Sequence, residues 1–458
     1  MKLVYNVDAK PAFKNAIVFA FQQLLAIMAA TIAVPMIISG TYDSVGEVSM
    51  SIGAALFGAG IGTIIYTLFT QRKSPVFLGS SFAFLGSMAA AFAGAVSAAA
   101  GFAGLLLGAL FAGLVYVVIS IIVQKAGVEW LNKLMPPVVI GPTVAIIGLS
   151  LAGNAVGDLR TANAGGAELI AIFCGLVTLL VVILCSVYGS KKISLIPFII
   201  GILAGFATAA ILTAIGSITD TQALMICDFG KITALWEGGV SFSTFISVPE
   251  FTFIKAFDGF GDITGAYVGT VAAAYVPVAF VVFAEHVADH KNISSIIEKD
   301  LLKDPGLHRT LLGDGVGSIA GAFFGGCPNT TYGESIACVA ITGNASVYTI
   351  FITAILAIAI SFVSPVVAFL SSIPSCVMGG VCMALYGFIA VSGLKMLQPV
   401  DLNNNRNLFT ASTILIAGIG GLSLNFGKVT ITTIATALIL GILVNIILSG
   451  KSTEAKEK

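Results

Sequence analysis

The stretch that decides the fold is Gly325-Gly326-Cys327-Pro328-Asn329-Thr330-Thr331-Tyr332-Gly333-Glu334-Ser335, a polar, glycine-rich break between two apolar runs. In hydrocarbon every backbone N–H and C=O must be paired, so a non-helical segment survives only where protein or a water-filled cavity surrounds it. A carboxylate at that depth is costly and usually functional. Gly333 lets the backbone approach a ligand closely, and a helix restarting near Tyr332 would point its free N–H groups into the break. The break therefore predicts a substrate site, and the alternative is a re-entrant loop or a packed kink.

The composition around this break is that of a polytopic membrane protein. Of the 458 residues, 57% are hydrophobic and 10% are charged, and the mean hydropathy is +1.04. Apolar stretches of about 18 or more residues recur along most of the chain, as in proteins that cross the membrane many times. The net charge is zero and there is no basic tract, so we expect no nucleic-acid partner. The seven cysteines lack C-x-x-C spacing, so we expect neither a disulfide framework nor a metal site.

We expect an all-α polytopic membrane protein with fourteen transmembrane segments. The first apolar run, residues 16–38, is too long for a signal-peptide core and therefore predicts the first span. The expected segments are 15–38, 51–70, 76–93, 102–124, 135–153, 167–188, 193–215, 266–292, 310–326, 331–342, 347–370, 374–394, 407–424 and 428–448. All but four of the 22 lysines and arginines then share one side with both termini, and the exceptions are Arg160, Lys231, Lys255 and Lys428. By the positive-inside rule both termini are cytoplasmic and the number of spans is even.

The longest outside loop, residues 216–265, divides the chain into seven segments plus seven. An odd number in each half forces the halves to be inverted, as in many secondary transporters. Residues 79–84 in segment three and 329–334 in segment ten both read small or polar, hydroxyl, hydroxyl, aromatic, small. Residues 135–141 and 373–379 share Pro, Val and Gly at matching offsets. These traces predict two inverted 7-segment repeats with a binding site near the middle of the membrane.

Two further carboxylates, Glu285 and Asp289, lie four residues apart at the end of the eighth segment and so share a helical face. His286 and His290 form a second pair on a neighbouring face. Their order is not H-E-x-x-H and no third ligand is evident, so no metal is expected. Asp289 and His290 either serve the site or lie at its cytoplasmic mouth. Glu285 and Glu334 are the two acids expected to be buried.

A buried pair of acids beside free backbone amides is compatible with a nucleobase as ligand. Such carboxyls can exchange protons near neutral pH. They accept bonds from N–H groups, while free backbone amides donate to carbonyls. A planar ligand with alternating N–H and C=O groups, such as a nucleobase, satisfies both. Gln22 and Gln23 either hydrogen-bond across helices or face the site, and Tyr386 either lines the site or is a packed tyrosine.

Five stretches carry a resemblance to a known family. They are residues 77–84 (FLGSSFAF), 284–287 (AEHV), 299–309 (KDLLKDPGLHR), 328–334 (PNTTYGE) and 377–381 (VMGGV). On these motifs the chain resembles the nucleobase–ascorbate transporter family from about residue 12 to 448, and within it the uracil:proton symporters. The Asn-Thr-Thr-Tyr-Gly-Glu run is specific, because purine-type relatives have a run rich in Gln and Asn there.

The resemblance implies the same fourteen segments, with a short strand in each of segments three and ten. A core domain, residues 1–134 and 266–370, is expected to move like an elevator against a gate domain, residues 135–215 and 371–458. Residues 216–265 would form an extracellular or periplasmic linker, and the chain would end in a cytoplasmic tail. The resemblance also implies a homodimer joined through the gate domains in the cell (inner or plasma) membrane.

The resemblance assigns roles to single residues. Glu285 and Glu334 would bind the N–H and C=O edge of the pyrimidine, and Phe82 and Gly333 would offer backbone amides. The residues that would pack around the ring are Ala30, Tyr332 and Tyr386. Protons are the expected coupling ion, carried by Glu285 with Asp289 as a candidate relay, and no cofactor is expected.

Three positions depart from the family's pattern. Asp289 stands where uracil symporters often have a histidine, and His290 lies one position later on a different helical face. Gln23 replaces a histidine that is common in the family, and Gly343 replaces an arginine that often ends the segment-ten motif. These departures concern the path of the proton more than the choice of substrate.

Proton-driven uptake of uracil is the leading hypothesis. The nearest alternative is the same kind of transporter carrying xanthine, uric acid or another nucleobase, because pocket shape decides between such ligands. An anion exchanger of the same architecture would hold its anion at helix N-termini, but Glu334 would repel it. A channel would need a continuous polar lining, and an enzyme would need a nucleophile with a base or a set of metal ligands. Neither is evident in the sequence.

Overall fold

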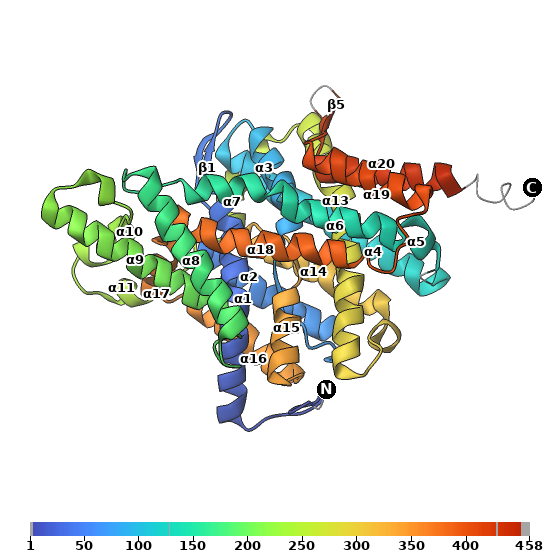
Figure 1. The fold of residues 1–458 in the computed structure, drawn as a ribbon, viewed down its shortest axis with the longest axis horizontal. Helices are drawn as coiled ribbons and strands as arrows, with labels where there is room; N and C mark the ends of the chain where they lie inside the picture. Colours follow the sequence, from blue (N-terminus) through green and yellow to red (C-terminus); the bar gives the residue numbers. More distant parts are fainter. Residues whose placement is uncertain (1–2, 128, 427–428, 450–458) are drawn as a thin grey trace, which may run out of the picture.

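The computed structural model describes residues 3–127, 129–426 and 429–449 (Figure 1). Within this part, eight helices are long and apolar enough to cross a membrane, and four shorter apolar helices accompany them. The chain is a mostly helical, polytopic membrane protein. The loop residue Lys428 and the expected cytoplasmic tail with Lys451, Lys456 and Lys458 lie outside the described residues.

The helices in the apolar stretches are α1 (Phe13–Ile38), α2 (Ile52–Phe69), α3 (Leu85–Ala93), α4 (Ala98–Ala126), α6 (Pro137–Ser150), α7 (Ala152–Leu159), α8 (Glu168–Tyr188), α9 (Pro197–Thr219), α13 (Gly265–Ile297), α14 (Leu307–Gly325), α15 (Gly333–Thr342), α16 (Val347–Ser361), α17 (Ser364–Ser371), α18 (Ser375–Lys395), α19 (Asn405–Ile419) and α20 (Thr433–Ser449). The short connecting helices are α5 (Glu129–Leu134), α10 (Gly230–Glu237), α11 (Phe242–Phe245) and α12 (Thr252–Ala256). Non-α helical turns lie at Phe82–Phe84, Gln222–Leu224, Phe257–Asp262 and Leu302–Gly306. The strands pair in sequence order as β1 (Gly40–Tyr42) with β2 (Gly46–Val48), β3 (Leu78–Ser80) with β4 (Asn329–Thr331), and β5 (Leu424–Phe426) with β6 (Val429–Ile431).

Two segments that the sequence predicts as single spans each contain a turn between two helices, although the helical stretch Pro137–Leu159 as a whole is long and apolar enough to cross the membrane once. The expected segment 135–153 forms α6 and α7, which meet at Leu151. The expected segment 347–370 forms α16 and α17, and Pro365 lies in the first turn of α17. Proline lacks an N–H but fits the first turn of a helix, so the chain starts a new helix there instead of extending the old one. The loop 216–265 also contains three short helices, α10 to α12.

The strands β3 and β4 come from distant parts of the chain and pair antiparallel in the interior. Their register is Leu78 opposite Thr331, Gly79 opposite Thr330 and Ser80 opposite Asn329. All of these residues are buried, so the pairing satisfies backbone groups that water cannot reach. Gly79 is required at its position, because a Cβ there would lie 2.4 Å from ring atoms of Tyr332.

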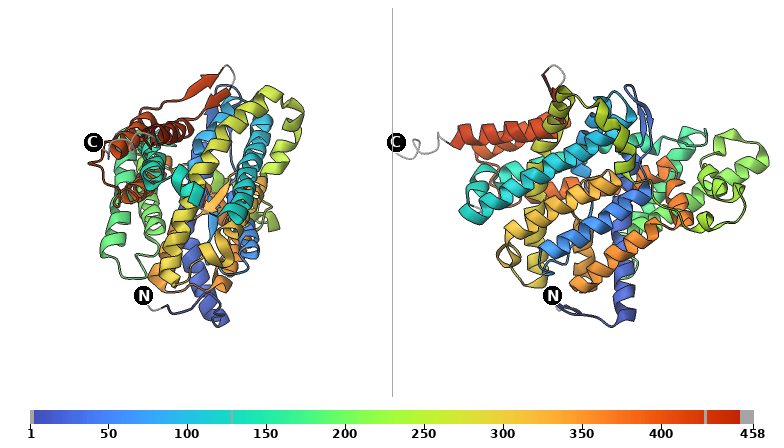
Figure 2. Two further views of the ribbon diagram at one scale, coloured as in Figure 1. Left: turned by 90° about the vertical axis from the view of Figure 1, so that its right-hand side faces the viewer. Right: turned by 180° about the vertical axis from the view of Figure 1, so that it is seen from behind.

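The long helices pack in two groups. In the first helix group, α1–α4 with α13–α17, α2 contacts α14 and α16, and α4 contacts α13 and α14. In the second helix group, α6–α9 with α18–α20, α18 contacts α6, α7 and α8, and α19 contacts α6 and α20. The left view of Figure 2 shows α8, α19 and α20 on one side and α2, α4 and α14 on the other. Small residues allow close helix approach: a Cβ at Gly58 of α2 would lie 2.4 Å from the carbonyl oxygen of Gly321 in α14.

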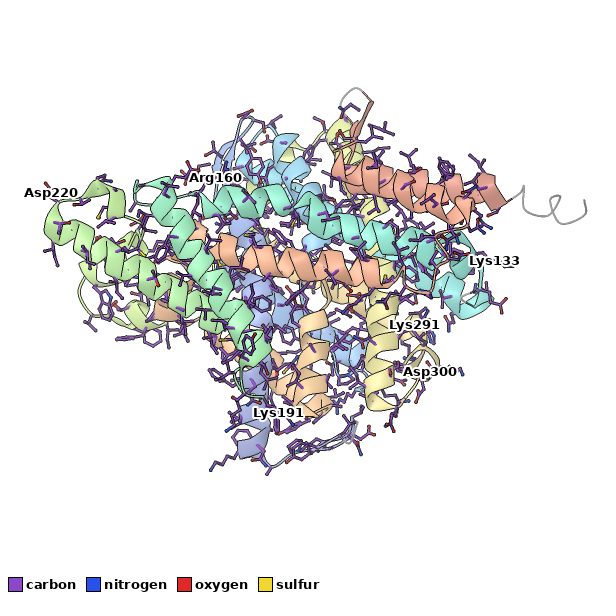
Figure 3. The ribbon with its side chains drawn as sticks, viewed as in Figure 1. Lys133, Arg160, Lys191, Asp220, Lys291 and Asp300 are labelled. Carbon is purple, nitrogen blue, oxygen red and sulfur yellow. The ribbon has the colours of Figure 1, made fainter. Side chains whose placement is uncertain are left out.

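Charged side chains lie at opposite edges of the molecule. In Figure 3, Lys191 lies near the bottom and Lys133, Lys291 and Asp300 lie toward the right, whereas Arg160 lies near the top and Asp220 at the far left. The first four come from the ends and loops expected in the cytoplasm, and the other two come from loops expected outside.

Candidate functional site

The break at residues 325–335 is built from a helix end, a strand and a helix start. α14 ends at Gly325, and Gly326 follows with φ of 74°, a left-handed conformation that glycine adopts without steric cost. β4 comes next, and α15 begins at Gly333. The first N–H groups of a helix have no partner within it. At Gly333 an added Cβ would meet no atom within 4 Å, so the backbone there is open to a ligand.

The other strand leads to a second helix start. After β3 the chain forms the turn Phe82–Phe84 and then α3. Because β3 and β4 are antiparallel, the chain leaves them in opposite directions, at the two ends of this three-residue pair. Phe82 and Gly333, one after each strand, line the same small cavity. Two helix starts from distant parts of the sequence therefore meet in the interior.

Two adjoining cavities contain the expected acids. The larger has a volume of about 570 Å³, within the usual range of roughly 300–1,000 Å³ for ligand pockets, and Glu285, Asp289 and Glu334 are in its wall. The smaller, of about 40 Å³, is lined by Phe82, Ala83, Ile147, Glu285, Thr330, Thr331, Tyr332, Gly333, Glu334 and Ile389. Glu285, Gly333 and Glu334 line both cavities, so the acids stand where the two spaces join.

The larger cavity extends from the interior toward one face of the protein. Its wall runs from Glu334, at the start of α15, to Asn292 near the end of α13. Ser194, just before α9, and Met396, just after α18, also line it. Lys191, only three residues before Ser194, is on the lower edge in Figure 3. The cavity therefore extends toward the side that the sequence predicts to be cytoplasmic.

The carboxylates of Glu285 and Glu334 approach the site from different helices. Glu285 lies on α13, and Glu334 lies in the first turn of α15. Both are partly buried. In the described part of the chain, no other side chain donates a hydrogen bond to either carboxylate, although each has two acceptor oxygens. Both groups are therefore available to accept N–H bonds from a ligand.

Asp289 belongs to the cavity wall, whereas its neighbour His290 does not. The Asp289 Oδ2 atom accepts a hydrogen bond of 2.7 Å from the hydroxyl of Thr331, the last residue of β4. His290 is fully buried, and its Nδ1 lies 2.8 Å from the carbonyl oxygen of His286. A carbonyl only accepts, so Nδ1–H must donate, and Nε2 at 2.6 Å accepts from the hydroxyl of Tyr66. The structure therefore places Asp289 in the wall of the larger cavity and His290 behind that wall.

His286 also points away from the cavities. Its Nδ1 lies 2.7 Å from Oδ2 of Asp314 in α14, and both side chains are fully buried. Its Nε2 lies 3.0 Å from the hydroxyl of Thr310. Both ring nitrogens of His286 thus join α13 to α14, and Nε2 of His290 joins α13 to α2, while Nδ1 of His290 bonds within α13.

The expected ring-packing residues occupy different positions. Phe82 meets Tyr386 edge to face, with 5.7 Å between ring centroids. Tyr332 lines the smaller cavity, and its hydroxyl donates a 2.8 Å hydrogen bond to the carbonyl oxygen of Ser80. Tyr386 and Ala30 are both buried and line neither cavity. The Tyr386 hydroxyl has no hydrogen-bond partner in the described part of the chain.

Two of the departures from the family pattern have a clear structural setting. The Gln23 side chain donates hydrogen bonds to Oγ (2.5 Å) and the carbonyl oxygen (3.3 Å) of Ser335, and that Oγ accepts from the N–H of Phe77. Gln23 therefore joins helices and does not face the cavity. Gly343 follows the last residue of α15 with φ of 67°, a conformation that disfavours any side chain. Its carbonyl oxygen accepts the N–H of Val4 at 2.8 Å.

Sequence reasoning missed the wall opposite the acids. This wall comes from the second helix group and consists of Val144 and Ile147 in α6 with Phe388 and Ile389 in α18. These apolar residues look like ordinary lipid-facing or core residues in the sequence. The matching Pro-Val-Gly starts of these two segments were the only signal that set them apart. Asn292, seven residues after Glu285 on the same face of α13, was also missed.

Comparisons with known proteins agree over nearly the whole chain. Residues 14–427 match the profile of a family described as a permease family. The uracil permease of Bacillus caldolyticus is 38% identical over 99% of this chain and 97% of its own length. The uracil permease of Escherichia coli K12 is 35% identical over 95% of this chain and 92% of its own length. The transmembrane domain of the cyanobacterial bicarbonate transporter BicA has the same fold, with a TM-score of 0.56 at 15% identity over 96% of this chain and 99% of that one.

Proposed function

The chain belongs to the permease family and is a transporter rather than an enzyme, and we propose that it imports uracil together with protons. The nucleobase–ascorbate resemblance is confirmed by this match, and the relatives described above are named for uracil. The observation that carries the proposal is the convergence of Glu285, Glu334 and the free start of α15 on one cavity.

The chemistry of this convergence fits a pyrimidine. Uracil presents N–H and C=O groups alternately along one edge. The carboxylates of Glu285 and Glu334 accept from the N–H groups, and charge-assisted bonds of this kind are the stronger ones. Backbone N–H groups near Gly333 and Phe82 donate to the carbonyls. Ile147 and Ile389 supply apolar contact on the opposite wall.

We assign the long and broken helices to fourteen transmembrane segments in two inverted repeats. In this assignment β3 with α3 forms segment three, and β4 with α15 forms segment ten. The first helix group is the core domain and the second helix group is the gate domain. The pairing of β3 with β4, one strand from each half, supports the repeat. The helices of each group contact one another more extensively than they contact the other group, which supports the domains.

The location of the site supports an elevator-like motion of the core domain against the gate domain. The acids and both helix starts belong to the core domain, whereas the facing wall of α6 and α18 belongs to the gate domain. Because the gate residues that line the two cavities are uncharged, the core can slide past them without breaking ion pairs there. The larger cavity, which extends toward the expected cytoplasmic side, corresponds to an inward-facing state.

Proton coupling is assigned to Glu285 with Asp289 as its relay. The two residues are one turn apart on α13 and both line the larger cavity. The hydrogen bond from Thr331 connects Asp289 to the strand that precedes Glu334. A change in the charge of Asp289 therefore alters its hydrogen bond to β4, the strand whose backbone leads to the substrate site.

The remaining assignments concern the surroundings of the protein. We place it in the cell membrane with both termini in the cytoplasm, as the lysine and arginine distribution predicts. A homodimer through the gate domains is consistent with the exposed apolar side chains on α19, Leu408, Phe409, Ile416 and Ile419.

Two alternatives remain within the same fold. Another nucleobase such as xanthine would use the same acids, and the size of the cavity next to Phe82 would decide between them. An anion exchanger is disfavoured, because Glu285 and Glu334 would repel an anion at the helix starts. The likeness to a bicarbonate transporter shows the fold alone.

Binding of uracil to the purified protein, measured by isothermal titration calorimetry, tests the assignment of the substrate. Uracil should bind, while xanthine and bicarbonate at the same concentrations should neither bind nor displace it. Tighter binding of xanthine would move the protein to the purine carriers, and binding of bicarbonate alone would make it an anion transporter.

A further inference from the structure

A cavity of about 700 Å³ lies apart from the substrate site, where the N-terminal segment crosses the ends of α2 and α16. It is lined by residues from 7–11, 67–72 and 347–351. Two of these segments, the N-terminal one and the start of α16, are held together by backbone hydrogen bonds. The N–H of Ala345 donates to the carbonyl oxygen of Tyr5 at 2.9 Å, and a second bond of this kind, at 3.1 Å, joins the residues 347 and 7. The backbone hydrogen bonds therefore fix two of the walls of this cavity in place.

The charge of this cavity is positive. Lys10 and Arg72 line it, and neither forms an ion pair within the described residues. Asp8 is the acid in its wall, and Asp8 Oδ2 lies 3.1 Å from Nζ of Lys299, outside the lining. Lys299 neutralises the charge of Asp8. The side chains of Lys10 and Arg72, unpaired among the described residues, therefore give the cavity a positive charge that attracts an anion.

Thr67 provides independent evidence for a ligand. It lines the cavity, its side chain is 2% exposed, and its hydroxyl has no hydrogen-bond partner in the described protein. Other threonines of the same region behave differently: the hydroxyl of Thr63 donates to the carbonyl oxygen of Ala59 (2.8 Å), and that of Thr70 to Tyr66 (2.9 Å). A buried hydroxyl without a partner is costly, and an oxygen of a bound anion would satisfy it.

The position of the cavity indicates what kind of anion it takes. It lies where α2 ends and α16 begins, which is the level of the membrane surface in the proposed topology. Leu68, 56% exposed, and Phe351 lie in the same wall as the cations. A ligand that combines a negative head with a hydrocarbon tail matches both parts of the wall, and inorganic phosphate matches only one.

We propose that this cavity binds the phosphate of an anionic phospholipid from the cytoplasmic leaflet. Lys10 and Arg72 pair with the phosphate, Thr67 donates a hydrogen bond to it after rotation about its Cα–Cβ bond, and Leu68 and Phe351 contact the acyl chain. The site is independent of the substrate that the transporter carries. It joins the N-terminal segment to α16, next to the loop that ends α15, so an occupied site braces the far end of the helix that carries Glu334.

Native mass spectrometry of the full-length protein, titrated with phosphatidylglycerol or phosphatidylcholine, tests the proposal. A Lys or Arg near an anionic lipid contributes a factor of about five in affinity. The double variant Lys10→Gln/Arg72→Gln should therefore bind phosphatidylglycerol roughly 25-fold more weakly. A matched double variant, Lys14→Gln/Lys125→Gln, removes two exposed cations that do not line the cavity and should bind as the wild type does. Phosphatidylcholine should bind weakly to all three proteins.

Three outcomes would overturn the proposal. Equal phosphatidylglycerol binding by wild type and Lys10→Gln/Arg72→Gln would remove the site, and an equal loss in the control variant would reduce it to diffuse charge attraction. Displacement of phosphatidylglycerol by inorganic phosphate at equal concentration would show that the cavity takes free phosphate and not a lipid. Thr67→Val should weaken binding and Thr67→Ser should restore it, which tests the hydroxyl separately from the charge.

Discussion

The substitution Glu334→Gln tests the substrate site with the least change in shape. Glutamine keeps the length of the side chain but removes its charge and replaces one acceptor with a donor. No other side chain of the described chain hydrogen-bonds to Glu334, and no neighbouring cation is left unpaired by the change. The effect on binding should therefore equal the loss of a charge-assisted hydrogen bond, which is about 1.5–3 kcal/mol. That free energy corresponds to a Kd for uracil raised about 10- to 150-fold.

The assay is calorimetric titration of uracil into the purified variant. Glu168→Gln is the matched control, because Glu168 is an exposed residue at the start of α8 whose carboxylate faces Arg160 at 3.4 Å, far from both cavities. The control should bind uracil with the affinity of the wild type, and its melting temperature reports any general loss of folding. Wild-type affinity in Glu334→Gln would refute the assignment of the acid pair to the substrate.

Two further predictions address coupling and the strand crossing. Thr331→Val removes the hydrogen bond to Asp289 (2.7 Å), so proton-driven uptake should fall at least about tenfold, and by more than uracil affinity falls, since Thr331 also lines the smaller cavity; unchanged uptake would separate Asp289 from coupling. Gly79→Ala places a Cβ 2.4 Å from the ring of Tyr332 and should lower the melting temperature by several degrees, because overpacking costs about 1–3 kcal/mol. The control is Gly86→Ala, where an added Cβ would meet nothing within 4 Å; equal melting temperatures for the two variants would contradict the close approach of β3 to Tyr332.

Much of the architecture is readable from the sequence because the bilayer imposes it. An apolar run as long as residues 15–38 has few alternatives to a spanning helix, and the structure has α1 at Phe13–Ile38. The same constraint makes the break at 325–335 conspicuous, since polar backbone and an acid need a reason to lie there. The structure places Gly333 and Glu334 of this break in the wall of both cavities.

The sequence does not determine which partner a buried polar side chain bonds to, because tertiary packing decides that. Helical periodicity places Asp289 and His290 on different faces, but only the folded structure shows that His290 bonds to Tyr66 of α2 while Asp289 bonds to Thr331 of β4. Gln23 is equally compatible with a substrate contact until its hydrogen bonds to Ser335 are seen.

The position of Gly343 illustrates the same limit. In the sequence, Gly343 stands out only because the family often has an arginine at this position. In the structure Gly343 ends α15 with a left-handed backbone conformation. Its carbonyl oxygen accepts hydrogen bonds from backbone N–H groups of the N-terminal segment. The apolar wall of α6 and α18 was equally hidden, because residues such as Ile147 and Ile389 differ from lipid-facing residues only by their place in the fold.

Uptake of radiolabelled uracil into proteoliposomes, with and without an inward proton gradient, tests the central claim most directly. We expect the gradient to stimulate uptake, unlabelled xanthine to leave that uptake unchanged, and Glu285→Gln to abolish the stimulation. Uptake of uracil that is indifferent to the proton gradient would contradict the claim and would show that Glu285 and Asp289 do not couple transport to protons.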